Sequence, residues 1–85
     1  MKRILHILKR KEDLFPLEII RKEAGSNEVS ILLIQDAVGL NLNGLGAKVF
    51  VLSEDLKDPQ NRSYPQIGYK EMLDFILKAD SVVTW

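Results

Sequence analysis

Few side chains in this sequence of 85 residues could carry out chemistry, and most of them follow apolar segments. Gln35 and Asp36 follow one such segment directly, and Glu54 and Asp55 follow the next one after a single serine. His6 is the one histidine, and it lies inside an apolar run near the start of the chain. Carboxylates and imidazole are the groups that proteins use most for acid–base chemistry, so the search for a site begins with these residues.

The familiar catalytic arrangements fail for lack of the residues they need. No cysteine is present, which excludes a thiolate nucleophile, thiolate metal ligands and disulfides. No serine lies in a G-x-S-x-G turn, and His6 has no second histidine to join it in a metal site. Asp36, Glu54 and Asp55 alone are weak evidence for a hard-cation site. We therefore predict no catalytic residue and no metal ligand, and we expect His6 to be a buried or half-buried histidine with a satisfied ring.

A nucleotide or flavin cofactor is not predicted either. In α/β folds such cofactors bind where a glycine-rich turn joins a strand to a helix. The first apolar segment is followed by the charged residues 9–13 without a glycine, and Gly44 and Gly46 precede a strand instead of a helix. We therefore expect no cofactor.

The pair Gln35 and Asp36 allows two interpretations. Asp36 could cap the following helix by accepting backbone N–H bonds, which contributes about 1 kcal/mol. Alternatively, the pair could form a polar rim that faces a ligand or partner at the carboxyl end of a sheet. Glu54 and Asp55 allow the same choice between a solvated rim and a contact surface, and Trp85 could cover the core or anchor an interface. We favour the cap for Asp36 and treat all five residues as candidates for an interface or rim.

Short apolar segments alternate with helical patterns along the chain. Strands are expected at Arg3–Leu8, residues 29–34, Lys48–Leu52, residues 67–69 and residues 81–85. The second and third of these are apolar at nearly every position, which indicates strands covered on both faces and hence a parallel sheet.

The first helix is expected where Leu14, Leu17 and Ile20 share one apolar face. Pro16 fits its first turn, and residues 25–27 should end it with a residue at positive φ. A short helical segment should begin at Asp36, residues 53–56 resemble a helix start, and residues 58–63 read as a loop. The last helix should bury one face and place two further apolar residues at its margins. Its expected buried residues are Tyr69, Met72, Leu73 and Ile76, with Phe75 and Leu77 at the margins.

These elements predict a single α/β domain over residues 1–85. Its three layers should be a mainly parallel sheet of four or five strands with helices on both faces, joined by right-handed crossovers. The 12 basic and 12 acidic residues cancel, so no general attraction to nucleic acid or to an anionic membrane is expected. No window approaches the roughly 20 apolar residues of a membrane span, and a cytoplasmic location is the default.

Several segments together resemble the DsrH/TusB family of sulfur-relay subunits. The matching segments are residues 5–8 (LHIL), 32–38 (LLIQDAV) and 49–56 (VFVLSEDL), with Tyr69, Phe75 and the C-terminal Trp85. The resemblance covers nearly the whole chain. Its most specific parts are the strand that ends in Gln-Asp before a small residue and valine, the strand that ends in Glu-Asp-Leu, and the terminal tryptophan.

The resemblance implies a DsrEFH-like fold and a heterohexamer, a dimer of heterotrimers with DsrE/TusD-like and DsrF/TusC-like subunits, that passes persulfide sulfur between carrier proteins. In the TusBCD branch the sulfur goes to 2-thiouridine at the tRNA wobble position, and in the DsrEFH branch it serves oxidative sulfur metabolism. The main acceptor cysteine lies on the DsrE/TusD-like subunit, so a chain without cysteine fits a non-catalytic subunit. Some DsrH-type members carry a cysteine where this chain has only the charged residues 9–13, which favours the tRNA branch.

Two alternatives come from other classes of protein. The chain could be a self-associating small-ligand or nucleotide-binding module with no sulfur role, or, last in rank, a cysteine-free enzyme that uses Asp36 with His6. The relay hypothesis predicts association through the apolar surface of the short helical segment after Asp36 and through the C-terminal end. It also predicts that Trp85→Ala and Gln35→Ala weaken assembly, and that the isolated chain could form a homo-oligomer.

Overall fold

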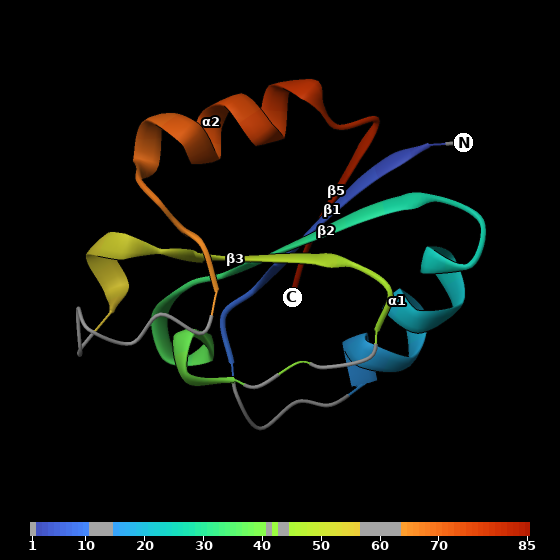
Figure 1. Ribbon diagram of the computed structural model, residues 1–85, viewed down its shortest axis with the longest axis horizontal. Helices are drawn as coiled ribbons and strands as arrows, with labels where there is room; N and C mark the ends of the chain where they lie inside the picture. The colour runs from blue at the N-terminus through green and yellow to red at the C-terminus, as the bar shows by residue number, and fades with distance from the viewer. Residues whose placement is uncertain (1, 11–14, 41, 43–44, 57–63) are drawn as a thin grey trace.

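The computed structural model describes residues 2–10, 15–40, 42, 45–56 and 64–85. Five parallel strands form one sheet in the order β4-β3-β2-β1-β5 (Figure 1). The strands are β1 (Arg3–Leu8), β2 (Glu28–Leu33), β3 (Lys48–Leu52), β4 (Gln66–Ile67) and β5 (Ser81–Thr84). The predicted α/β class and the parallel sheet are confirmed.

Strand β2 lies at the centre of the sheet because it is apolar on both sides. It pairs with β1 along one edge and with β3 along the other. Ile31, Leu32 and Leu33 are each at most 1% exposed, although their side chains alternate between the two faces. The continuous apolar run therefore marks a strand that is covered above and below, as predicted.

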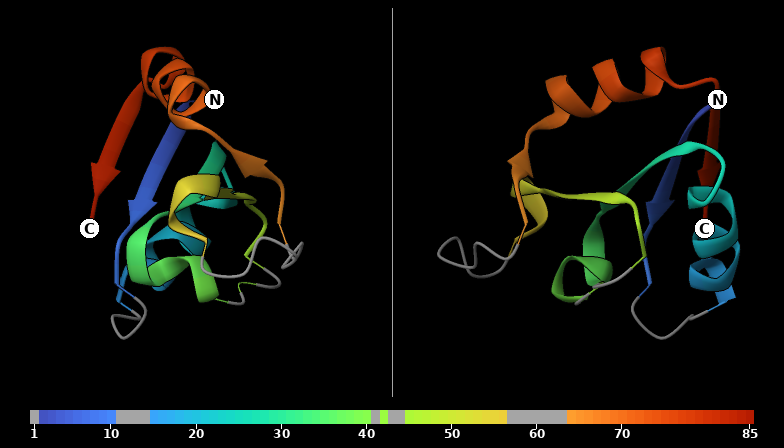
Figure 2. Two further views of the ribbon diagram at one scale, coloured as in Figure 1. Left: turned by 90° about the vertical axis from the view of Figure 1, so that its left-hand side faces the viewer. Right: turned by 45° about the vertical axis from the view of Figure 1, so that its right-hand side comes forward.

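The helices lie on opposite faces of the sheet and make three layers (Figure 2). They are α1 (Phe15–Ala24), the 3-10 helices η1 (Gln35–Gly39) and η2 (Ser53–Asp55), and α2 (Tyr69–Lys78). We call the side of the sheet that packs against α1 the α1 face; it includes Ile31 and Val49. The opposite side, which packs against α2, is the α2 face and includes Leu5 and Leu32. None of the described helices is long and apolar enough to cross a membrane.

Helix α1 has Pro16 in its first turn, as predicted, but its C-terminus is not formed by a residue at positive φ. Pro16 is its second residue, where the missing N–H costs little. The helix stops before Gly25, but this residue does not take a positive φ; among the described glycines Gly46 does, at 74°. Instead, the carbonyl of Glu23 accepts the backbone N–H of Asn27 at 2.9 Å and its side-chain amide at 3.2 Å. Asn27 thereby satisfies a carbonyl that the end of the helix leaves open.

Helix α2 packs on the sheet with a face rotated from the predicted one. Phe75, which we expected at the margin, contacts Phe50 with ring centroids 4.8 Å apart, and Met72 packs beside it as predicted. Tyr69 and Leu73, which we expected on the buried face, are exposed. The apolar residues of α2 span more of the helix circumference than the sheet covers, so a second apolar row stays outside.

The other differences from the sequence prediction concern short elements. The segment expected to begin a helix at Asp36 is one 3-10 helix that begins at Gln35, and the helix-start pattern at residues 53–56 produces only the single turn η2. Strand β4 ends at Ile67 because Tyr69 already begins α2. The loop expected at residues 58–63 and the apolar position Leu14 lie outside the described residues.

The connections between strands cover the two faces unequally. On the α1 face, η1 and the residues after it add Ala37, Leu42 and Leu45 to the buried cluster. The hydroxyl of Tyr64 accepts the backbone N–H of Leu42 and holds this connection against the same face. On the α2 face, no second helix among the described elements joins α2. The part of that face formed by β2 and β3 is therefore less completely covered.

Candidate functional site

Four of the five predicted site residues meet at the carboxyl ends of β2 and β3. These strands are parallel neighbours, so η1 and η2, which follow them, are in contact at one edge of the sheet. Gln35 and Asp36 belong to η1, and Glu54 and Asp55 belong to η2. We call these four residues the acidic rim. It lies at the carboxyl edge of the sheet, the edge at which open α/β sheets bind ligands, although the strand order reverses between β1 and β5 rather than between β2 and β3.

Asp55, rather than Asp36, holds the start of η1. The backbone N–H of Gln35 donates to Asp55 Oδ2 at 2.8 Å, whereas Asp36 is exposed and its carboxylate accepts no hydrogen bond from the described residues. The prediction that Asp36 caps this helix is therefore wrong, because the carboxylate comes from the next connection along the chain. Gln35 itself has a φ of 51°, a left-handed conformation that costs roughly 1 kcal/mol for a residue with a Cβ atom.

The acidic rim carries negative charge without the geometry of a metal site. Asp55 is engaged with Gln35, and Glu54 accepts the hydroxyl of Ser53 at 3.3 Å. No group of three or more histidine, aspartate and glutamate side chains in the described part of the chain could hold a metal ion. The rim can therefore offer hydrogen-bond acceptors and charge to a partner or ligand.

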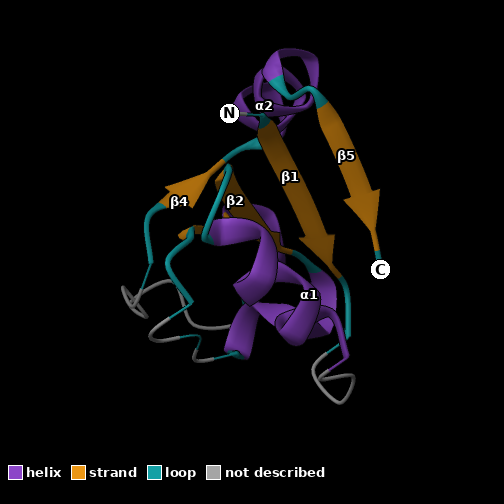
Figure 3. Cartoon of the chain, turned by 90° about the vertical axis from the view of Figure 1, so that its right-hand side faces the viewer, coloured by secondary structure: helices purple, strands orange, loops and turns teal. Residues whose placement is uncertain are grey.

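Trp85 lies apart from the acidic rim. It follows β5, which pairs with β1 at the opposite edge of the sheet from β4 (Figure 3). Its indole Nε1–H donates to His6 Nδ1 at 3.0 Å, and the two rings are nearly parallel, with an interplanar angle of 16° and centroids 6.1 Å apart. Phe15 packs edge-on against the same indole, and the backbone N–H of Trp85 donates to the carbonyl of Ile7. In this structure Trp85 covers the core, which is the first of its two predicted roles.

His6 is fully buried, and both of its ring nitrogens are occupied, as predicted for a satisfied histidine. Because Nδ1 accepts the indole N–H of Trp85, Nε2 carries the ring proton and donates to Glu23 Oε1 at 2.5 Å. We call the chain of contacts Trp85–His6–Glu23 the histidine clamp. Asp36 is not among the partners of His6, so the structure does not bring together the pair that a cysteine-free enzyme would use.

Two features were not predicted from the sequence: the contact of Glu23 with His6, and an exposed apolar stripe on α2. Glu23 lies three residues after the buried Ile20, and this spacing on the inward side of α1 was the signal for its contact with His6. Tyr69, Leu73 and Leu77 are 56%, 57% and 75% exposed and recur every four residues. This spacing places them in one stripe roughly 12 Å long, which we call the α2 row.

Among the described residues, three of the five exposed large apolar side chains lie on α2 and none on η1, where we expected them; the other two are Phe15 of α1 and Val82 of β5. Ala37 and Val38 are at most 9% exposed, so η1 turns its apolar side chains into the core and presents a polar surface. Val82 of β5 is 40% exposed and pairs with Leu5 of the α2 face. Exposed apolar side chains on this side of the molecule therefore come from both α2 and the edge strand.

Comparison with known proteins gives a structural match and no family assignment. No protein-family model and no curated protein matches the sequence. The crystal structure of the YchN protein from E. coli is similar over the full length of both chains, with a TM-score of 0.65 and 14% sequence identity. At this level of identity the similarity establishes the fold alone.

Proposed function

We propose that this chain is a non-catalytic subunit of a persulfide sulfur-relay complex of the DsrH/TusB type, which serves the 2-thiolation of wobble uridine in tRNA. The observation that carries the proposal is the α2 row, an exposed apolar stripe on a chain that contains no cysteine. A subunit that assembles with sulfur carriers, without carrying sulfur itself, needs both properties.

The chemistry of sulfur relay supports a non-catalytic role. A persulfide passes on its outer sulfur when an acceptor thiolate attacks that sulfur and the donor thiolate leaves, as in thiol–disulfide exchange. This chain has no thiol to attack with, and its one histidine is buried and hydrogen-bonded at both nitrogens. In the proposal, the reacting cysteines therefore belong to the DsrE/TusD-like and DsrF/TusC-like partners.

The α2 row has the composition of a helix that packs against a partner. Full burial of Leu73 or Leu77 would stabilise an interface by about 1.5–3 kcal/mol for each side chain. Apolar anchors four residues apart are typical of helices that lie in an apolar groove. Asp74 and Lys78 form an ion pair at 2.9 Å on the neighbouring polar side of the helix, which bounds the row.

The acidic rim would be a second contact surface in such a complex. Asp36 of η1 and Glu54 of η2 are both exposed, and η1 and η2 are in contact at the carboxyl edge of the sheet. In the proposal this rim shapes a surface that a cysteine-bearing partner uses, and the assembly is a cytoplasmic heterohexamer. A net charge of zero provides no general attraction to RNA, so direct contact with tRNA is assigned to the other subunits.

Co-expression with DsrE/TusD-like and DsrF/TusC-like chains tests the proposal. With a tag on one partner only, we expect all three chains to copurify and native mass spectrometry to show a dimer of heterotrimers. The same purification without the tagged partner is the control for nonspecific retention. If the chain stays a monomer or homodimer beside both partners, the proposed function is wrong.

A labelled persulfide donor then tests the non-catalytic role inside the complex. We expect the labelled sulfur to appear on the cysteine of a partner and to be absent from this chain in a non-reducing gel. Loss of labelling when the partner cysteine is replaced by serine is the matched control. Label that stays on this chain would contradict the assignment.

A further inference from the structure

A cavity of about 410 Å³ lies on the α2 face near the amino ends of β1, β2 and β3. Its apolar lining includes Leu5 and Phe50 from the strands, with Phe75 and Ala79 from the end of α2 and the residue after it. The volume falls within the range of about 300–1,000 Å³ that is typical of small-molecule sites. The acidic rim stands at the other ends of the same strands, so the cavity is a separate feature.

Ser30 keeps this cavity open. It lies in β2, where the three residues that follow it are large, apolar and buried, and its neighbours in register are Leu5 and Lys48. Ser30 lines the cavity and is half-buried, and its hydroxyl group has no hydrogen-bond partner among the described residues. A leucine at this position would extend into the space. Serine instead leaves room there and presents a hydroxyl group.

Positive charge predominates around the cavity. Arg3, Lys48 and Lys78 line it, against the single carboxylate of Glu28. Arg3 Nε is paired with Glu28 at 3.2 Å, and Lys78 is paired with Asp74. Lys48 has no ion-pair partner in the part of the chain that the structure describes. An anion that enters the cavity would therefore meet an ammonium group whose charge is not already balanced.

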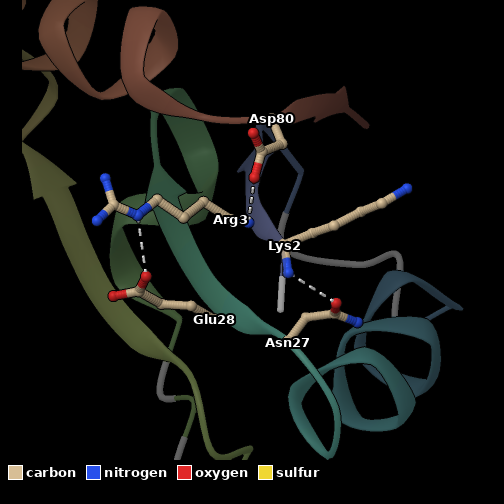
Figure 4. A network of polar contacts seen from close by, with 5 residues as sticks. All are labelled: Lys2, Arg3, Asn27, Glu28 and Asp80. Carbon is tan, nitrogen blue, oxygen red and sulfur yellow. Dashed lines mark hydrogen bonds and ion pairs between the residues drawn. The ribbon is translucent and has the colours of Figure 1, made fainter.

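The wall of the cavity at the amino end of β1 is held by other segments of the chain. The backbone N–H of Arg3 donates to Asp80 Oδ2 at 2.9 Å, and that of Lys2 donates to Asn27 Oδ1 at 3.3 Å. Figure 4 shows these contacts together with the side chain of Arg3 turned toward Glu28. Because hydrogen bonds within the chain hold this edge, binding would require little ordering of the chain.

We propose that the cavity binds a small aliphatic carboxylate. The apolar chain of the ligand would lie against Leu5, Phe50 and Phe75, and its carboxylate would accept hydrogen bonds from the ammonium of Lys48 and the hydroxyl of Ser30. Such charge-assisted hydrogen bonds are roughly twice as strong as neutral ones. None of the residues of the α2 row lines the cavity, so this inference is independent of the relay proposal.

Titration of the full chain with decanoate, below its micelle concentration, tests the inference. In two-dimensional NMR spectra of the labelled amide groups, we expect saturable shifts centred on Ser30, Phe50 and Ala79. Decyltrimethylammonium has the same chain with the opposite charge, and we expect it to bind at least about tenfold more weakly because Lys48 repels it. Equal binding of the two amphiphiles, or decanoate shifts centred on Leu73 and Leu77, would show that the site is wrong.

Variants at the cavity distinguish the contribution of its volume to decanoate binding from the contribution of the Lys48 charge. Lys48→Gln alters only an exposed side chain and should weaken decanoate binding about tenfold. Ser30→Leu should weaken binding strongly, because its side chain would project into the cavity, whereas Ser30→Ala keeps the space and should lose only a few-fold in affinity. Leu73→Asp, outside the cavity, should bind as the original chain does. Unchanged binding by Lys48→Gln would contradict the proposal even if Ser30→Leu failed to fold.

Discussion

The α1 face and the α2 face of the same sheet are covered to very different extents. Eleven described residues form one buried cluster on the α1 face, which the histidine clamp adjoins, whereas the buried cluster of the α2 face has three members. The cause is the path of the chain, because η1 and the residues that follow it fold onto the α1 face. Helix α2 therefore covers the opposite face without help from another described helix, and it leaves the α2 row and the cavity open to solvent.

This difference assigns most of the stability of the fold to the α1 face and leaves the α2 face available for binding. Apolar burial contributes roughly 25 cal/mol for each Å² removed from water, so the face with the larger cluster supplies most of the stability. The other face keeps apolar side chains that a partner or a ligand could cover while the fold stays intact. A small domain with limited buried surface is a reasonable candidate for such association.

The largest expected effect is a truncation on the α1 face. Ile31 is 0% exposed, so Ile31→Ala should lower the free energy of unfolding by about 2–5 kcal/mol in urea titrations followed by circular dichroism. Leu73→Ala on the α2 row is the matched control and should change it by less than about 0.5 kcal/mol. Similar losses in the two variants would remove the distinction between the faces.

Next in size is the loss of one hydrogen bond in the histidine clamp. Trp85→Phe keeps an aromatic ring but leaves the buried His6 Nδ1 without its donor, which should cost about 1–3 kcal/mol of unfolding free energy. Glu23→Gln should cost less than Glu23→Ala, because the amide oxygen can still accept the N–H of Nε2. If Trp85→Phe leaves thermal unfolding unchanged, the clamp does not stabilise the α1 face.

A smaller effect is expected where η2 holds the start of η1. Asp55→Ala removes the acceptor of the Gln35 N–H and should lower the unfolding free energy by roughly 1 kcal/mol. Asp36→Ala is the control with an equal change in charge, and we expect it to be close to neutral. The opposite order of the two variants in the same urea titration would restore Asp36 as the cap.

The smallest expected effect is a gain in stability at Gln35. Its φ of 51° suits glycine, so Gln35→Gly should raise the unfolding free energy by up to about 0.5 kcal/mol, after the greater flexibility of glycine in the unfolded chain is subtracted. Gln35→Ala retains a Cβ atom and should bring no gain. A loss of stability in the glycine variant would mean that the Gln35 side chain contributes more than its backbone costs.

The strands could be predicted because their signal is local. The third strand, Lys48–Leu52, has the predicted bounds, and the two-sided apolar pattern of β2 correctly indicated a central strand. The sequence assigned Gln35 and Asp55 separately to a rim, and the observed pairing of β2 with β3 brings both to the same edge of the sheet. Likewise, a lone histidine in an apolar strand was correctly expected to be buried and satisfied.

The remaining features depend on contacts between distant segments, which the local pattern does not contain. The N–H of Gln35 is bound by a residue 20 positions away, and His6 is bound by residues 17 and 79 positions away. The apolar arc of α2 is too wide to show by itself which side meets the sheet. The cavity at Ser30 depends on which face the connection through η1 covers, which periodicity does not reveal.

The central claim is that the α2 row joins this chain to cysteine-bearing partners, and one copurification tests it most directly. The double variant Leu73→Asp, Leu77→Asp is compared with Lys70→Asp, which changes the net charge by the same amount on the polar side of α2. Tagged DsrE/TusD-like and DsrF/TusC-like chains should retain the original chain and Lys70→Asp, and should lose the double variant while it stays folded by circular dichroism. Retention of the folded double variant at the level of the original chain would contradict the account.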